Sequence, residues 1–179
     1  MTVIVGIPHN GVVHLGADSQ VSLGWSKGSL TESKIWASGD CIFGFAGVWR
    51  EAQILKYRVD IPKLPDPDDL MRWLVVDLVD MIRKSRKDSG FDEKLSDGPE
   101  QGPHLLIGVL GQLFQMDTSY SILEMPGGAA IGSGSDHAEG SLHTSAGIWK
   151  NPRRRIEAAL QAACTHNMGC QAPFTFLSR

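Results

Sequence analysis

The chain has 179 residues, which is within the range of one ordinary domain, and with 42% hydrophobic residues it can bury a substantial core. Its formal net charge of −3 gives no electrostatic reason to expect nucleic acid as a partner. No apolar run approaches the length of a membrane span, and the short apolar stretch after Met1 lacks the basic flank of a signal peptide. We therefore expect one cytoplasmic domain over residues 1–179.

The first third of the chain is predicted to be β-structure. Strands are expected over residues 3–7 and 12–17, joined by a hairpin turn with the Asn10-Gly11 signature. A short strand is expected over 33–36. The continuous apolar run over 41–46 has no alternation, which predicts a strand covered on both faces.

Helices are predicted next, over residues 49–58 and about 70–87. The second has apolar residues at helical spacing, and Asp77, at the border of that stripe, is expected to be a solvated charge. Residues 85–103 are polar and rich in Gly and Pro, which predicts a surface loop within the domain.

The second half repeats this order. Strands are expected over 104–110 and 113–117, with a turn at Gly111-Gln112, and then over 120–125 and 129–131. Two helices close the chain, over about 136–146 and 153–168. Paired strands before each helix pair favour an α+β arrangement, with antiparallel sheets and helices on their outer faces.

The three cysteines, Cys41, Cys164 and Cys170, are an odd number without the spacing of a secreted disulfide framework. They are interpreted as reduced thiols of a cytosolic chain. His166 lies between the last two, but no second Cys/His pair completes a tetrahedral zinc site.

Thr2 is the most informative residue for chemistry. A small residue at position two permits removal of Met1, and the chain would then begin with a threonine that carries both a hydroxyl and a free α-amine. An N-terminal amine titrates near pH 8, so it can accept the hydroxyl proton and make the threonine a nucleophile with its own base. The alternative is that Thr2 is simply a residue of an edge strand.

A threonine nucleophile also needs a positive field and donors for the oxyanion. Lys34 could supply the field, since an ammonium nearby lowers the pKa of the terminal amine, and Asp18 could orient Lys34. The Gly47 N–H could serve the oxyanion, and Ser133 could bond the amine. Each residue alone also has a structural explanation. Asp18 could be a turn cap and Lys34 an exposed strand charge, while Gly47 could end a strand and Ser133 could cap a helix N-terminus.

Together these residues resemble a known family. The N-terminal Thr2, the segment Gly16-Ala-Asp-Ser-Gln20, Lys34 at its spacing from Thr2, Gly44-Phe-Ala-Gly47 and Ala130-Ile-Gly-Ser-Gly134 are similar to the proteasome β subunits. They are more similar still to HslV, the peptidase of the bacterial HslUV protease. These are N-terminal-nucleophile (Ntn) hydrolases, and the resemblance covers nearly the whole chain.

The resemblance implies a fold and a set of roles. The fold would be a four-layer αββα sandwich of two mainly antiparallel sheets flanked by helices. Thr2 would be the nucleophile, Asp18 and Lys34 its charged pair, Gly47 the oxyanion turn and Ser133 the supporting serine. Pocket-lining residues by the same analogy are Val21, Phe45 and Trp49, which would favour apolar side chains.

The resemblance also implies an assembly and an ion. Subunits of this kind stack as hexameric or heptameric double rings that enclose the active sites, with an ATP-dependent unfoldase as partner and unfolded polypeptides as substrates. No cofactor is needed for the chemistry. In HslV-like members, backbone carbonyls bind a monovalent cation, and Cys164, Asn167 and Cys170 have the corresponding spacing for a structural sodium ion. Asn167 and Cys170 stand where the family often has an acidic residue and a serine.

The sequence therefore predicts a self-compartmentalising threonine endopeptidase that hydrolyses peptide bonds of unfolded chains. Two alternatives stay open. The chain could be an inactive structural ring subunit of the same fold, although the intact set of Thr2, Asp18 and Lys34 argues against this. It could also be a small-molecule amide hydrolase of the wider Ntn class, although these more often carry Cys or Ser as nucleophile.

Overall fold

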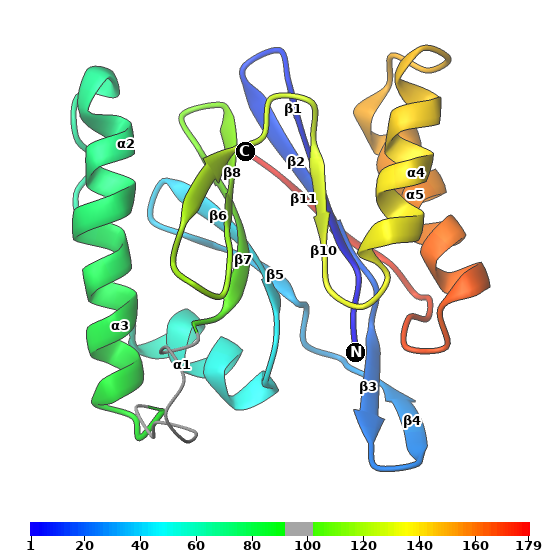
Figure 1. Cartoon of the computed structure of the whole chain (residues 1–179), viewed down its shortest axis with the longest axis horizontal. Coiled ribbons are helices and arrows are strands. Elements are labelled where there is room, and N and C mark those ends of the chain that lie inside the picture. Colours follow the sequence, from blue (N-terminus) through cyan, green and yellow to red (C-terminus); the bar gives the residue numbers. More distant parts are fainter. Residues whose placement is uncertain (92–101) are drawn as a thin grey trace.

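A computed structural model of the chain describes residues 1–91 and 102–179. It contains two main antiparallel sheets, a separate two-stranded hairpin and helices on both sides of the sheet pair (Figure 1). The strands are β1 (Ile4–His9), β2 (Val12–Ala17), β3 (Gln20–Leu23), β4 (Ser26–Ser29), β5 (Ile35–Ser38), β6 (Cys41–Ala46), β7 (His104–Val109), β8 (Gln112–Met116), β9 (Ile122–Glu124), β10 (Ala129–Ile131) and β11 (Thr175–Ser178). The helices are α1 (Trp49–Arg58), the 3₁₀ turn η1 (Pro67–Asp69), α2 (Leu70–Trp73), the π-helical turn η2 (Leu74–Leu78), α3 (Val79–Lys87), α4 (Ser135–Ala146) and α5 (Pro152–His166). This confirms the predicted α+β class.

Strand order shows how the halves of the chain combine. The first sheet has the order β10-β1-β2-β11 and the second the order β5-β6-β7-β8-β9, while β3 and β4 pair only with each other. The hairpin turn between β1 and β2 has positive φ at both Asn10 (51°) and Gly11 (76°), as a type I′ turn requires. The corresponding turn between β7 and β8 is at Leu110-Gly111, one residue earlier than predicted, because Leu110 also adopts positive φ (48°).

Three apolar clusters hold these elements together. The first lies between β5–β8 and the helices α1 to α3. The second lies between the first sheet and α4 and α5, and the third lies between the two sheets. Strand β6 is buried at every position, with Phe43 and Phe45 facing the helices and Ile42 facing the other sheet, so the prediction of a strand covered on both faces is confirmed.

The predicted helices are observed with small shifts of their ends. The helix predicted over 70–87 is continuous in direction but includes the π-helical turn η2, and Asp77 is exposed there as expected. Residues 92–101 of the predicted surface loop lie outside the described residues. Within the described part of the chain, no helix is long and apolar enough to cross a membrane.

Three strands were not predicted. The hairpin β3–β4 is short and mostly polar, with Gly24 (φ 59°) in its turn, and it lacks the apolar alternation that would indicate strands. Strand β11 pairs with β2 through Phe176 opposite Gly16, a contact between distant parts of the sequence. A Cβ on Gly16 would lie 2.4 Å from Ile156 Cγ2 and 3.3 Å from the Phe176 ring, so this glycine lets helix α5 pack closely on the sheet and leaves room for the Phe176 side chain of the neighbouring strand.

Candidate active site

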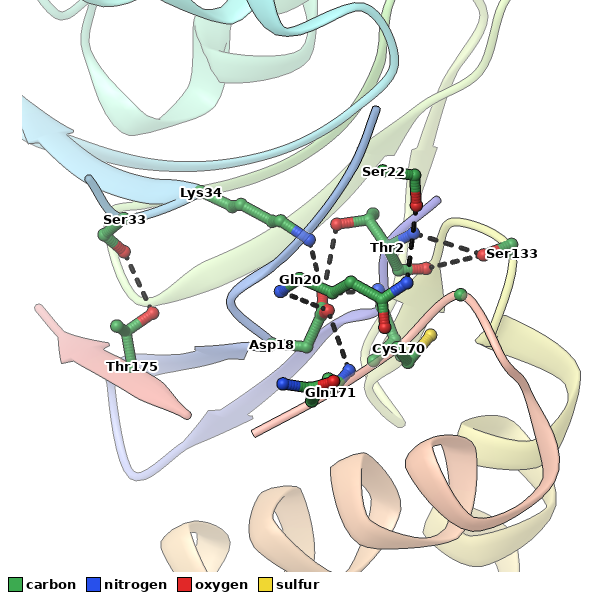
Figure 2. A network of polar contacts seen from close by, with 12 residues as sticks. Thr2, Asp18, Gln20, Ser22, Ser33, Lys34, Ser133, Cys170, Gln171 and Thr175 are labelled. Carbon is green, nitrogen blue, oxygen red and sulfur yellow. Dashed lines mark hydrogen bonds and ion pairs between the residues drawn. The ribbon is translucent and has the colours of Figure 1, made fainter. Parts of the chain in front are cut away.

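The predicted residues converge because of strand register. Ile4 in β1 is opposite Ala17 in β2 on one side and Ile131 in β10 on the other. Residues just beyond these pairs therefore meet at one end of the first sheet, and these include Thr2, Asp18 and Ser133. Lys34 immediately precedes β5 of the second sheet and reaches the same point from across the interface between the sheets (Figure 2).

Asp18 is the centre of this site. Its carboxylate is 1% exposed, and Oδ1 accepts hydrogen bonds from the Thr2 hydroxyl (3.1 Å), the Val3 N–H (2.9 Å) and the Lys34 ammonium (2.7 Å). Oδ2 accepts from the backbone N–H groups of Gln20 (3.0 Å) and Gln171 (3.2 Å). Five donors, one of which is the buried counter-charge of Lys34, compensate the loss of water around this carboxylate.

Ser133 holds the main chain of Thr2. The Thr2 nitrogen donates to Ser133 Oγ at 3.1 Å, and Ser133 Oγ donates to the Thr2 carbonyl at 3.3 Å. With Met1 attached, that nitrogen is a peptide amide, and it stands in for the α-amine that removal of Met1 would release. Ser133 is thus placed where a partner of the amine is needed. The Gly132 conformation (φ 96°) belongs to the same contact, because a Cβ there would lie 2.4 Å from the Thr2 carbonyl oxygen.

The loop after α5 closes the site from the other side. The Asn167 side chain donates from Nδ2 to the Ser133 carbonyl (2.5 Å), and its Oδ1 accepts from the Gly169 N–H (2.8 Å). The Met168 carbonyl accepts from the Gln20 side chain at 3.1 Å. These side-chain roles of Asn167 and Gln20 were not predicted. Gln20 was part of the motif that carried the resemblance, whereas Met168, the residue that its side chain contacts in this loop, is 148 positions away and leaves no local signal.

Cys170 lies beside this loop as a buried thiol. Its Sγ is 3.9 Å from Asn167 Oδ1, and a Cβ on Gly134 would lie 2.8 Å from Sγ. Burial, together with the negative charge of Asp18, raises the pKa of Cys170 to about 11, and burial likewise raises that of Cys164 to about 11. Both thiols are therefore neutral near pH 7 and are poor nucleophiles. All three cysteines are free.

The residues of the predicted cation site lie at the end of α5 and in the loop after it. The carbonyl of Asn167 accepts the Cys170 N–H at 3.2 Å, which leaves one lone pair for another partner. Backbone ligation of a cation by Cys164, Asn167 and Cys170 stays a prediction.

Of the remaining predicted residues, Phe45, Gly47 and Trp49 are in or next to β6 of the second sheet, and Val21 is in the separate hairpin. Gly47 is exposed between β6 and α1, and a Cβ on it would lie 2.8 Å from the Phe45 ring. Phe45 itself is 2% exposed and Trp49 packs against the same cluster, while Val21 is half-buried in β3. Within the described residues, no hydrogen bond connects Gly47 to Thr2. The structure thus joins Thr2, Asp18, Lys34 and Ser133 in one network and leaves Gly47 and the side chains of the three pocket candidates outside it, although the Phe45 N–H donates to the Lys34 carbonyl at 3.1 Å.

Solved structures of similar fold cover nearly the whole chain. They include a BPH from Thiobacillus denitrificans in complex with epoxomicin, at a TM-score of 0.82 and 18% identity over 100% of this chain and 98% of that one. They also include a eukaryotic HslV from Trypanosoma brucei, at 0.69 and 17% over 98% of each chain. An Anbu (Gly-1) mutant from Hyphomicrobium sp. strain MC1 matches at 0.70 and 15%, over 98% of this chain and 80% of that one.

No protein-family model matches the sequence. These three neighbours are Ntn hydrolases of the proteasome type. At 15–18% identity the likeness concerns the fold and not the activity. The resemblance to proteasome β subunits and HslV that the sequence motifs indicate is therefore confirmed at the level of the fold, which this chain shares with HslV, Anbu and BPH over almost its entire length.

Proposed function

We propose that the chain is a threonine endopeptidase of the proteasome type, with Thr2 as nucleophile after removal of Met1. The observation that supports this best is the chain of contacts from the Thr2 hydroxyl through Asp18 to Lys34, with Ser133 at the Thr2 nitrogen. The Thr2 hydroxyl and the buried Lys34 ammonium share one carboxylate oxygen of Asp18, and the future amine is on the same residue as the hydroxyl. Those are the parts that an N-terminal nucleophile requires.

In the proposed reaction, Thr2 Oγ1 attacks the scissile carbonyl while the free α-amine takes its proton. The amine then gives this proton to the leaving peptide amine, and an acyl-enzyme ester remains on Oγ1. Asp18 keeps the hydroxyl and the ammonium of Lys34 oriented, and the Gly47 N–H is proposed to donate to the oxyanion. Hydrolysis of the ester restores the free threonine.

We extend the proposal to the assembly. Helix layers outside two packed sheets support the αββα sandwich of the Ntn hydrolases (Figure 1). In that fold a double ring of six or seven copies would enclose the active sites and admit unfolded polypeptides, which an ATP-dependent unfoldase would supply. A sodium ion on the carbonyls of Cys164, Asn167 and Cys170 would be structural.

The experiment is hydrolysis of fluorogenic peptides by the purified chain, after intact mass has shown that Met1 is gone. Thr2→Ala should abolish turnover while leaving the assembly unchanged. The matched control is Thr144→Ala, which removes the hydroxyl of an exposed threonine on α4 and should retain wild-type rates. Substantial turnover by a clean Thr2→Ala preparation would overturn the proposed nucleophile.

Epoxomicin, the ligand of the Thiobacillus neighbour, offers a second measurement. We expect it to stabilise the mature wild-type chain against heat and to have no effect on Thr2→Ala. Absence of both stabilisation and peptide hydrolysis would favour the inactive ring subunit, and hydrolysis of small amides without cleavage of peptides would favour the small-molecule amide hydrolase.

A further inference from the structure

Gln20 has a buried side-chain oxygen that receives no hydrogen bond from the described residues. The residue is 2% exposed, and its Nε2 donates to the Met168 carbonyl (3.1 Å) and to Ser22 Oγ (3.3 Å). Within the described part of the chain, no group donates to its Oε1. A buried acceptor without a partner destabilises the fold, and such atoms are rare in native proteins.

The orientation of this amide is fixed by its surroundings. Exchanging the positions of Oε1 and Nε2 would place an oxygen against the Met168 carbonyl, so the nitrogen must face that group. The backbone N–H of the same residue donates to Asp18 Oδ2, which ties Gln20 to the carboxylate that also binds the Thr2 hydroxyl. Gln20 is therefore joined to the active-site network through its backbone, and a flip of the amide cannot relieve its unsatisfied oxygen (Figure 2).

Met1 covers the adjacent part of the loop. A Cβ on Gly169 would lie 2.5 Å from Met1 Cβ and 2.6 Å from Met1 Sδ, so the Met1 side chain rests against Gly169, next to the Met168 carbonyl that holds Gln20. Thr2 is only 6% exposed beneath it. Removal of Met1 would uncover Thr2 and open space next to Gly169. It would also convert the Thr2 amide into an amine, which has a second N–H and a lone pair.

We infer that Gln20 positions the water that hydrolyses the acyl-enzyme. In the mature chain this water would occupy part of the space left by Met1, donate one hydrogen bond to Gln20 Oε1 and face the Thr2 amine. A buried water needs two to four polar partners; Gln20 Oε1 and the Thr2 amine supply two, and a lone pair of the water oxygen faces the ester carbonyl carbon. This inference depends on the proposed function and assigns a positioning residue for its second half-reaction.

The step balances without any other reactant. The water oxygen attacks the ester carbonyl, and the neutral Thr2 amine takes one of its protons. The bond between the carbonyl carbon and Thr2 Oγ1 then breaks, and Oγ1 takes that proton back from the amine. The peptide leaves as a carboxylic acid, with the second water proton on its new hydroxyl. Gln20 neither gains nor loses a proton.

The test separates acylation from deacylation. Gln20→Met preserves the length of the side chain and the backbone N–H to Asp18 but removes Oε1. With a fluorogenic peptide, we expect the first turnover to release fluorophore at close to the wild-type rate, followed by a steady state slower by about tenfold or more. Intact mass should show the acyl group accumulating on the chain. A merely structural role of Gln20 would slow both phases together and leave no acyl-enzyme.

Two controls keep the inference falsifiable. Ser22→Ala removes one acceptor of Gln20 Nε2 and leaves Oε1 intact, so it should not accumulate acyl-enzyme. If Gln20→Met does not fold, a high-resolution crystal structure of the mature wild-type chain decides: we expect an ordered water within hydrogen-bond distance of Gln20 Oε1. A protein donor on that oxygen, or deacylation by Gln20→Met at the wild-type rate, would overturn the inference. Absence of any hydrolysis by the wild-type chain would instead contradict the proposed function.

Discussion

Breaking the buried pair of Asp18 and Lys34 should cost more stability when one partner is replaced than when the other is. The two side chains are almost completely buried, and their charged atoms are 2.7 Å apart. Lys34→Met removes the ammonium but keeps most of the aliphatic stem, whereas Asp18→Asn removes the negative charge and keeps the shape. Both break the same ion pair. They differ in what is left behind in the interior.

The partners that remain decide which change costs more. After Lys34→Met, the Asp18 carboxylate still accepts from the Thr2 hydroxyl and from three backbone N–H groups, those of Val3, Gln20 and Gln171. After Asp18→Asn, the Lys34 ammonium loses the carboxylate that binds it. Breaking a buried ion pair lowers the free energy of unfolding by about 3–5 kcal/mol. Because its carboxylate keeps four donors, Lys34→Met should lie near the lower end of this range. Because its ammonium loses the carboxylate, Asp18→Asn should lie near the upper end.

Urea unfolding at fixed protomer concentration measures this difference. Lys56→Met is the matched control, because the 2.8 Å pair of Lys56 and Glu32 is about a quarter exposed and should contribute less than about 1 kcal/mol. Both active-site variants should also lose most peptide hydrolysis, and Lys34→Arg should not restore it, since a planar guanidinium does not replace a compact ammonium. The reasoning would be refuted if either active-site variant lost less unfolding free energy than Lys56→Met. It would also be refuted if Lys34→Met lost more unfolding free energy than Asp18→Asn.

Three further results are expected. Light scattering should give the mass of a closed ring, and a stable monomer at micromolar concentration would contradict the proposed compartment. Gly44→Ala should destabilise the fold by about 1–3 kcal/mol, because its Cβ would lie 2.6 Å from Ile4 Cγ2, whereas Gly28→Ala, with its nearest neighbour at 3.5 Å, should be nearly neutral in the same urea titration. Peptide hydrolysis should rise with pH as the Thr2 amine loses its proton. The midpoint of this rise should lie below the reference pKa of a terminal amine, about 7.7–8.0, because the Lys34 ammonium is proposed to lower that pKa. Chains that keep Met1 should stay inactive at every pH, and normal turnover by them would show that the proton goes elsewhere.

The spacing of apolar residues predicted the elements whose side chains meet the core at regular intervals. Helix α1 was predicted with its observed ends, and the stripe of Leu70, Trp73, Leu74 and Leu78 gave the long helix, because each side chain meets the core at helical spacing. The π-helical turn left no such signal. Strand β11 is held mainly by its partner β2, about 160 residues earlier, so its own four residues could not reveal it.

Of the candidate site, too, only a part was predicted from the sequence. Thr2, Asp18, Lys34 and Ser133 were recognised through a resemblance and not through periodicity, and the structure places all four in one network. The side chains of Gln20 and Asn167 were missed as members of this network, because their partners come from a loop and a strand end that only the fold brings together. The resemblance drew attention to the backbone of Asn167, whereas the described contacts involve its side-chain amide.

The contacts of Asp18 change the argument about an inactive subunit. Its carboxylate ties together the start of β1, the start of β3, the residue before β5 and the loop after α5, so Asp18 and Lys34 have a structural reason to be present whether or not the chain is an enzyme. Their presence alone therefore discriminates weakly between an enzyme and a structural ring subunit. The Thr2 hydroxyl contributes only one of the five donors, and the Thr2 nitrogen becomes a base only when Met1 is gone. For this reason Thr2→Ala with a verified N-terminus, and no substitution of Asp18 or Lys34, separates chemistry from folding.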